Sequence, residues 1–254
     1  MKTYNIESPS ASQKPMDASH IETTDSAWKP LYRVGGAAAL ILLGLIPIQI
    51  IIFIAHPPPS TVIGYFTLFQ NNWLLGLLNL DLLYMLTMVL TVLIYLALYA
   101  ALRRASPSFM AIALTLGLVG IAVYFASNTA FEMLSLSSQY AAATTDAQRS
   151  TFLAAGQAML ALYQGTAFDV SYVLGGVTSL IIAVVMLRSN IFSKGTAYVG
   201  LLMSVMMIVP PTLGTIGLDF ALISLLPLAI WFILIARRLF QLAQGGSNEE
   251  ANRN

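Results

Sequence analysis

The sequence predicts an all-α fold, a polytopic transmembrane helical bundle with about six spans. Of the 254 residues, 57% are hydrophobic and only 9% are charged, whereas soluble domains carry about 25% charged residues. So few polar side chains cannot cover a globular surface, and we therefore expect lipid to be the solvent for most of the chain. The hydrophobic residues also gather in runs close to the roughly 20 residues that cross about 30 Å of hydrocarbon.

Six apolar runs give the expected spans, at residues 34–54, 81–102, 109–129, 169–187, 196–211 and 219–236. Together they predict a membrane domain over residues 29–240. The fifth run ends in Pro210-Pro211, so we expect it to be short or kinked there. Residues 1–28 are rich in Ser, Thr and Pro and have no apolar period, which indicates a disordered tail. Residues 241–254 are expected to form a second, short tail.

The basic residues predict the orientation. If the N-terminus is cytoplasmic, every Lys and Arg except Arg149 lies in a tail or in a loop on the cytoplasmic side. Short loops rich in Lys and Arg stay inside. This predicts a multi-pass cell-membrane protein with both termini in the cytoplasm, and it favours six spans over five or seven.

Two long outer loops are expected to contain helices. Residues 60–72 predict a short amphipathic helix at the membrane interface, with Ser60 as its N-cap. In the second loop, Thr145 and Gln148 have the spacing of a capping box ahead of an apolar run. We expect that helix either to rest on the mouth of the bundle or to continue into the span at 169–187.

A weak internal repeat is visible at three span starts, Asn79–Tyr84, Ala167–Tyr172 and Gly217–Phe220. Three related antiparallel helical hairpins would produce it. Convergence under the same membrane constraints explains the pattern equally well.

Two short motifs suggest a family. Residues 31–36 (LYRVGG) and 79–84 (NLDLLY), with the six-span layout, resemble an uncharacterised bacterial membrane family, the domain of unknown function four-three-eight-six. The resemblance covers Trp28 to Leu239. It implies a helical bundle in a bacterial inner membrane, and it implies no activity and no functional residue.

Four acidic residues fall at the outer ends of the expected spans, where ionisable groups in membranes are often functional. Asp81, Asp169 and Asp219 each lie near the start of an inward-running helix, where favourable interaction with the helix dipole is a structural alternative. Glu132 lies near the C-terminal end of the third span, where the dipole disfavours an anion. It shares a helical face with Asn128, although solvation in the loop would also explain it.

The second span carries the clearest polar stripe. Six side chains fall on one helical face, namely Asp81, Tyr84, Met88, Thr91, Tyr95 and Tyr99. Gly175, Ser179 and Ala183 form a small-residue face on the fourth span that could pack against it. Ordinary interhelical hydrogen bonds would explain the stripe. The alternative is an outward-facing cavity whose ligand-binding residues are Asp81, Tyr84, Thr91, Asn128, Glu132, Asp169, Tyr172 and Asp219.

The composition also excludes several function classes. The chain has no cysteine, and no histidine or lysine lies within a span, which argues against thiolate or histidine metal sites, catalytic Ser-His pairs and retinal-type Schiff bases. A net charge of +1 argues against a nucleic-acid partner. We expect no metal, no cofactor and no catalytic residue. The leading hypothesis is a bundle that binds or moves a small or lipid-like ligand. An accessory membrane subunit with a partner protein is the alternative, and a carboxylate-based membrane enzyme is the third.

Overall fold

The computed structural model describes residues 27–245, and within that range it contains helices and no strand. Of the tails expected at residues 1–28 and 241–254, residues 1–26 and 246–254 lie outside the described residues. The helices are α2 (Lys29–Ala55), α3 (Val62–Asn71), α4 (Trp73–Asn79), α5 (Leu82–Leu102), α6 (Pro107–Ser127), α7 (Ala130–Ala142), α8 (Asp146–Tyr163), α9 (Thr166–Arg188), α10 (Lys194–Met206) and α11 (Gly214–Gln244).

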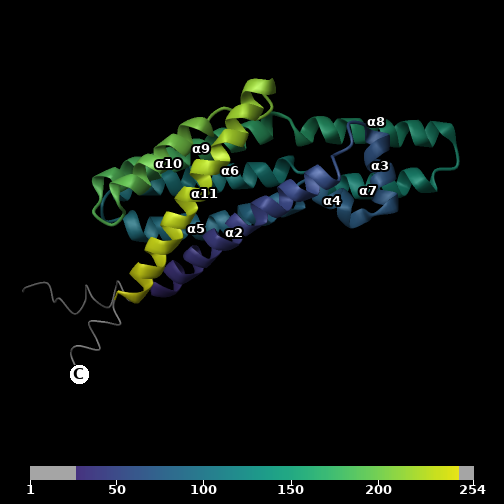
Figure 1. Cartoon of the computed structure of the whole chain (residues 1–254). Coiled ribbons are helices and arrows are strands. Elements are labelled where there is room, and N and C mark those ends of the chain that lie inside the picture. Colours follow the sequence, from purple (N-terminus) through teal and green to yellow (C-terminus); the bar gives the residue numbers. More distant parts are fainter. Residues whose placement is uncertain (1–26, 246–254) are drawn as a thin grey trace, which may run out of the picture.

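Six of these helices form a closed ring, the six-helix ring, in which each packs against its neighbour in chain order. The order is α2, α5, α6, α9, α10 and α11, and α11 packs back against α2. Five helical stretches are long and apolar enough to cross a membrane, and they contain every member of the ring except α10. The predicted membrane-spanning helical bundle is therefore confirmed (Figure 1).

The fifth expected span, 196–211, differs from the structure. Helix α10 has 13 residues and ends at Met206, so it reaches about 20 Å at 1.5 Å per residue and is too short to cross about 30 Å of hydrocarbon alone. Residues 207–213 continue as turns through Pro210 and Pro211, because proline has no N–H to extend the helix. The chain therefore completes this limb of the ring without a full-length helix.

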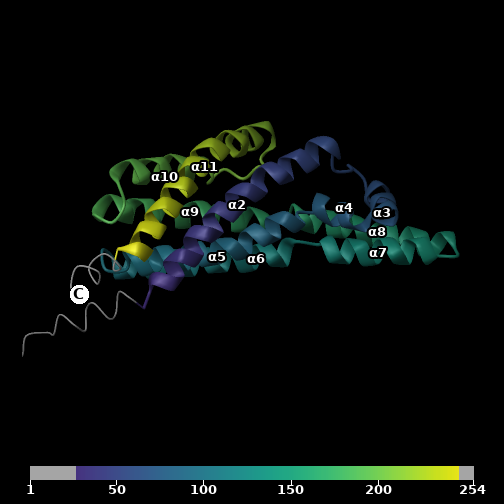
Figure 2. The same ribbon diagram turned by 60° about the horizontal axis from the view of Figure 1, so that its bottom comes forward.

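Helices α3, α4, α7 and α8 pack into a small second unit, here called the cap, at one end of the ring (Figures 1 and 2). Its own core contains Tyr65, Phe66, Phe69, Leu77 and Met133. Helix α7 follows α6 after two residues, and α9 follows α8 after Gln164 and Gly165. The two resulting stretches have 36 and 43 residues, or roughly 54 and 65 Å. They are much longer than a bilayer core, so the cap extends beyond the ring.

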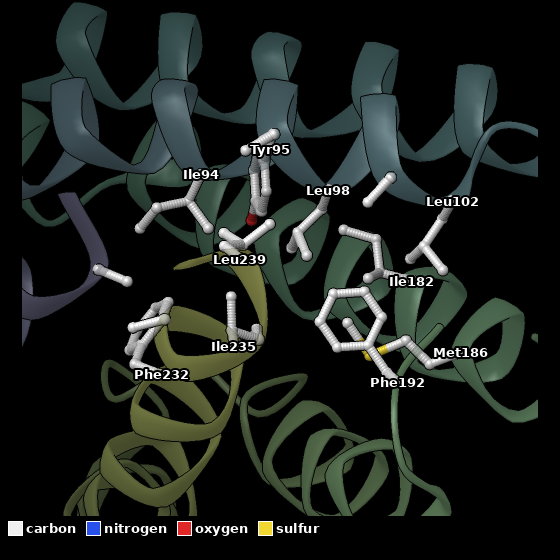
Figure 3. Close-up of a cluster of buried hydrophobic side chains, with 14 of the residues drawn as sticks. Ile94, Tyr95, Leu98, Leu102, Ile182, Met186, Phe192, Phe232, Ile235 and Leu239 are labelled. Atoms are coloured by element: carbon white, nitrogen blue, oxygen red, sulfur yellow. The ribbon is translucent and has the colours of Figure 1, made fainter. Parts of the chain in front are cut away.

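The opposite end of the ring, here called the basic end, is densely packed. Figure 3 shows side chains from α5, α9 and α11 meeting there, including Leu98, Met186 and Ile235, each fully buried. Basic residues tie this end together, since Arg238 of α11 donates to the backbone oxygen of Ile191 in the α9–α10 loop. The guanidinium of Arg103 lies 4.6 Å from the centre of the Trp28 ring, a cation–π contact.

Helices α2 and α11 touch at the basic end and separate toward the cap (Figure 1). A Cβ added to Gly35 would lie 2.4 Å from Cβ of Ala97 on α5, and one added to Gly36 would lie 3.1 Å from the Phe240 ring on α11. The close approach of α2 to α5 therefore requires glycine at position 35, and a side chain at position 36 would press on the Phe240 ring. At the other end of α2, Gln49 donates to the backbone oxygen of Leu78, which draws the helix toward the cap and away from α11.

The structure confirms one predicted helix start and differs from the predictions at another helix start and at one helix end. The capping box of Thr145 and Gln148 is confirmed, and it begins α8. The N-cap of α3 is Thr61 rather than Ser60, because the Thr61 side chain accepts a hydrogen bond from the Gly64 N–H. Helix α11 continues to Gln244, so residues 241–244 are helical and do not belong to the expected tail.

The small-residue face of α9 meets its expected partner only in part, because Ser179 hydrogen-bonds with Tyr95 of α5 whereas the other two positions do not face α5. Ala183 packs near Gly200 of α10, while an added Cβ at Gly175 would meet nothing within 4 Å. The main neighbours of α9 are α6 and α10, and it meets α5 only marginally.

Candidate functional site

The six-helix ring encloses a cavity of about 390 Å³ in its cap-end half, next to the packed core of the basic end. Every helix of the ring contributes side chains to it. The walls are mostly apolar, with a few polar groups, which is the usual make-up of a site for a small organic ligand. The polar and aromatic lining residues are Gln49, Phe53, Asp81, Tyr84, Thr87, Thr91, Tyr95, Phe168, Ser171, Tyr172, Ser179, Ser224, Trp231 and Phe232.

One wall of the cavity is the polar stripe predicted on α5. Asp81, Tyr84, Met88, Thr91 and Tyr95 all line the cavity. Helical periodicity alone placed these side chains together, because positions three and four apart share a face. The structure adds Thr87 to this wall, and it leaves Tyr99 outside it.

Asp81 lies at the cap end of this wall, in an unusual backbone conformation. Its φ is 66° and its ψ is 30°, in the left-handed region, and it precedes the first residue of α5. Aspartate is one of the few residues with a side chain that adopts this conformation readily. The carboxylate makes no capping hydrogen bond to the helix. Capping therefore does not explain this aspartate, and its side chain is left to face the cavity.

The cap holds Asp81 in position. The hydroxyl of Tyr163, the last residue of α8, donates a hydrogen bond to Asp81 Oδ2. The amide of Asn128, between α6 and α7, donates to the backbone oxygen of Leu80 at 2.9 Å, and its own oxygen accepts from the Ala130 N–H at 3.1 Å. Burial and the nearby Asp81 carboxylate raise the pKa of Tyr65, on α3, to about 12, so this phenol stays neutral.

Aromatic rings continue from Asp81 along the cavity. The rings of Tyr84 and Tyr124 meet edge to face at 4.9 Å, Tyr124 lies 6.5 Å from Phe168, and Phe168 stacks on Tyr172 at 6.4 Å. Tyr84, Phe168 and Tyr172 line the cavity, while Tyr124 is buried behind them. These contacts join α5, α6 and α9 into one aromatic wall.

Four of the hydroxyl groups in the cavity already donate to backbone oxygens of their own helices. Thr87 donates to the backbone oxygen of Tyr84 at 2.7 Å, and Thr91 donates to that of Thr87 at 2.7 Å. Ser171 and Ser224 donate in the same way to the backbone oxygens three residues earlier, at 2.6 and 2.7 Å. Each hydroxyl has one proton and two lone pairs, so these four side chains keep acceptor capacity only.

The structure does not bring all eight predicted residues together. Asp81, Tyr84, Thr91 and Tyr172 line the cavity. Asn128 supports the cavity from behind, through Leu80. Asp169, in the first turn of α9, accepts a hydrogen bond from Thr212 and does not line the cavity.

Glu132 and Asp219 lie elsewhere, and both are exposed. Glu132 is in the first turn of α7, not at the C-terminal end of a helix as expected, so the helix dipole favours its charge there. Asp219 is on α11, beyond its first turn, and it does not line the cavity. The four outer acidic residues therefore do not converge on one site.

Two walls of the cavity, from α2 and α11, were not predicted from the sequence. Gln49 and Ile46 come from α2, and Ser224, Leu228 and Trp231 come from α11. A signal was present for α2, since Gln49 is the one amide side chain in an otherwise apolar run. The tilt of α11 against α2 depends on packing over the whole ring, so no local pattern could place its residues.

The cavity reaches the surface at α2. Ile50 lines the cavity and is 40% exposed, and Ile51 beside it is 63% exposed. On α11, Leu225 lines the cavity next to Leu226, which is 70% exposed. The rim is therefore apolar on both helices where they separate. Such a rim suits contact with lipid rather than with water.

Within residues 27–245 no cluster of histidine, cysteine and acidic side chains could hold a metal ion. No family model, no curated protein and no solved structure matches this chain. The family resemblance suggested by residues 31–36 and 79–84 therefore stays a prediction.

Proposed function

We propose that this protein binds a small amphipathic or lipid-like molecule, which enters the cavity of the six-helix ring from the membrane between α2 and α11. We further propose that the basic end faces the cytoplasm of a bacterium and that the cap lies outside, as the distribution of Lys and Arg favours. The polar end of the ligand would lie near Asp81, and its apolar part would contact Leu42, Ile46 and Leu228.

The observation that carries this proposal is the position of the cavity. A volume of about 390 Å³ lies within helices that are long and apolar enough to cross a membrane. Its one charged side chain, Asp81, lies at the cap end, and its rim is apolar. An amphipathic molecule matches both features, because its head can reach the polar groups while its tail stays in contact with apolar side chains.

The test uses Trp231, which lines the cavity and is 1% exposed. The chain has three tryptophans, so Trp28→Phe with Trp73→Phe leaves Trp231 as the only one. In this background, the full-length protein in lipid nanodiscs is titrated with 8-bromooctan-1-ol, whose bromine quenches tryptophan fluorescence on contact. We expect saturable quenching of Trp231.

Two glycine variants supply the control. An added Cβ meets nothing within 4 Å at Gly175, which lines the cavity, or at Gly44, which is exposed on α2. Gly175→Leu should fill the cavity and abolish saturable quenching, whereas Gly44→Leu should leave it unchanged. Non-saturable quenching in every variant would refute the proposal. If that result came with a stoichiometric partner protein in purification, an accessory subunit would be the better interpretation.

A further inference from the structure

The charge of the cavity is set by one residue. Asp81 is the only charged side chain among those that line it. Within the described residues Asp81 forms no ion pair, and its carboxylate has one hydrogen-bond donor, the Tyr163 hydroxyl. A carboxylate removed from bulk water is stable only when its charge is compensated. A cationic group in the cavity would supply that compensation.

Four aliphatic hydroxyl groups of the cavity favour the same kind of ligand. The hydroxyl protons of Thr87, Thr91, Ser171 and Ser224 are all engaged with backbone oxygens of their own helices. What these side chains present to a ligand is lone pairs. A ligand rich in N–H donors would satisfy them, whereas a phosphate or carboxylate would place acceptor against acceptor. The hydroxyls of Tyr84, Tyr95 and Tyr172 can donate or accept. The indole N–H of Trp231, which has no hydrogen-bond partner among the described residues, is a donor, so the preference for N–H groups belongs to the four aliphatic hydroxyls and not to the whole lining.

The aromatic wall adds a third contribution. Tyr84 lies close enough to Asp81 to interact with it electrostatically, and Phe168 and Tyr172 follow along the same side of the cavity. Aromatic faces attract cations, and most strongly where water is excluded. A carboxylate next to several aromatic rings is an arrangement that recognises organic ammonium groups.

From these three observations we propose that the ligand is an organic cation, an amine protonated at neutral pH with an apolar chain or ring system. Its ammonium group binds Asp81 and the neighbouring hydroxyl oxygens, and its apolar part lies between α2 and α11. This inference rests on the proposed function and adds the charge and the hydrogen-bonding type of the ligand.

The experiment uses the same Trp231 reporter with three probes of one chain length, 8-bromooctylamine, 8-bromooctan-1-ol and 8-bromooctanoate. The amine should bind most tightly and the carboxylate most weakly. Asp81→Asn keeps an acceptor for Tyr163 and removes the charge. It should weaken binding of the amine by about 10- to 100-fold, as expected for loss of a charge-assisted hydrogen bond, and weaken binding of the alcohol far less, because the amide oxygen introduced there still accepts from a hydroxyl. Asp219→Asn, at an exposed acidic residue outside the cavity, should change neither.

The outcomes separate the two proposals. If no probe gives saturable quenching, the proposed function itself fails. If the alcohol or the carboxylate binds as tightly as the amine, or if Asp219→Asn weakens the amine as much as Asp81→Asn does, the cavity binds amphipathic molecules but does not select cations. Thermal unfolding of each variant shows whether Asp81→Asn retains the fold.

Discussion

At the scale of single residues, the position of Asp81 is maintained by groups that do not themselves line the cavity. Its left-handed backbone favours Asp, Asn or Gly. The Asn128 amide holds the preceding carbonyl, and the Tyr163 hydroxyl holds the carboxylate. These three residues come from separate stretches of the chain, so the cap and the ring must fold together before the acidic group is in place. Asn128 and Tyr163 are therefore positioning residues.

Removal of the Tyr163 hydroxyl tests this arrangement. Tyr163→Phe should lower the free energy of unfolding by about 1.5–3 kcal/mol, the usual value of a hydrogen bond to a charged group. Denaturation of the purified protein in mixed micelles measures it. Tyr198→Phe is the matched control, because Tyr198 is 62% exposed, and it should change the free energy by less than about 0.5 kcal/mol. Equal effects of the two substitutions would show that Tyr163 does not hold Asp81.

At the scale of helices, the cavity exists because α2 and α11 are close at one end and apart at the other. Gly35 brings α2 against Ala97 of α5 at the basic end, and Gln49 anchors α2 to Leu78 near the cap. A helix fixed at two points with different neighbours must tilt. The space that the tilt leaves near the cap is the cavity.

The contact between Gly35 and Ala97 can be tested by a pair of substitutions. Gly35→Ala should destabilise the protein by about 1–3 kcal/mol, because the new methyl overlaps Cβ of Ala97 and the helices must move apart. Ala97→Gly in the same chain should restore most of the lost free energy of unfolding. Gly44→Ala, whose methyl meets open space, should be neutral. A double variant no more stable than Gly35→Ala would contradict this close approach.

The features that could be predicted from the sequence are those whose pattern lies within a single helix. The stripe on α5 and the capping box of α8 are periodic or local patterns, and the structure confirms the capping box and places five of the six stripe residues, all but Tyr99, on the cavity wall. The end of α6 could not be predicted from a local pattern of this kind. Residues 128 and 129 interrupt the helix without proline or glycine, and the break is stabilised by a hydrogen bond to Leu80, 48 residues away. For this reason Glu132 was assigned to the wrong end of a helix.

At the scale of the whole molecule, the structure divides into a ring that lipid can surround and a cap that extends beyond it. The exposed large apolar side chains are numerous on α2 and α11, among them Ile41, Ile51, Ile223 and Leu226. In water such surfaces would associate, and in a bilayer they need no cover. The basic residues gather at the end of the ring away from the cap, which gives the molecule a polarity across the membrane.

The orientation of this polarity in the membrane can be tested by cysteine labelling. The chain has no cysteine of its own, so a single introduced cysteine is labelled without background. Gln139→Cys places a thiol on exposed α7 in the cap, and Ser108→Cys places one at the exposed start of α6, at the basic end. In intact bacterial cells, a membrane-impermeant maleimide should label Gln139→Cys and not Ser108→Cys, and permeabilised cells should label both. The reverse pattern would place the cap in the cytoplasm, against the preference of Lys and Arg for that side. In that orientation the proposed ligand would enter from the cytoplasmic leaflet, because the cavity opens between α2 and α11 in the cap-end half of the ring.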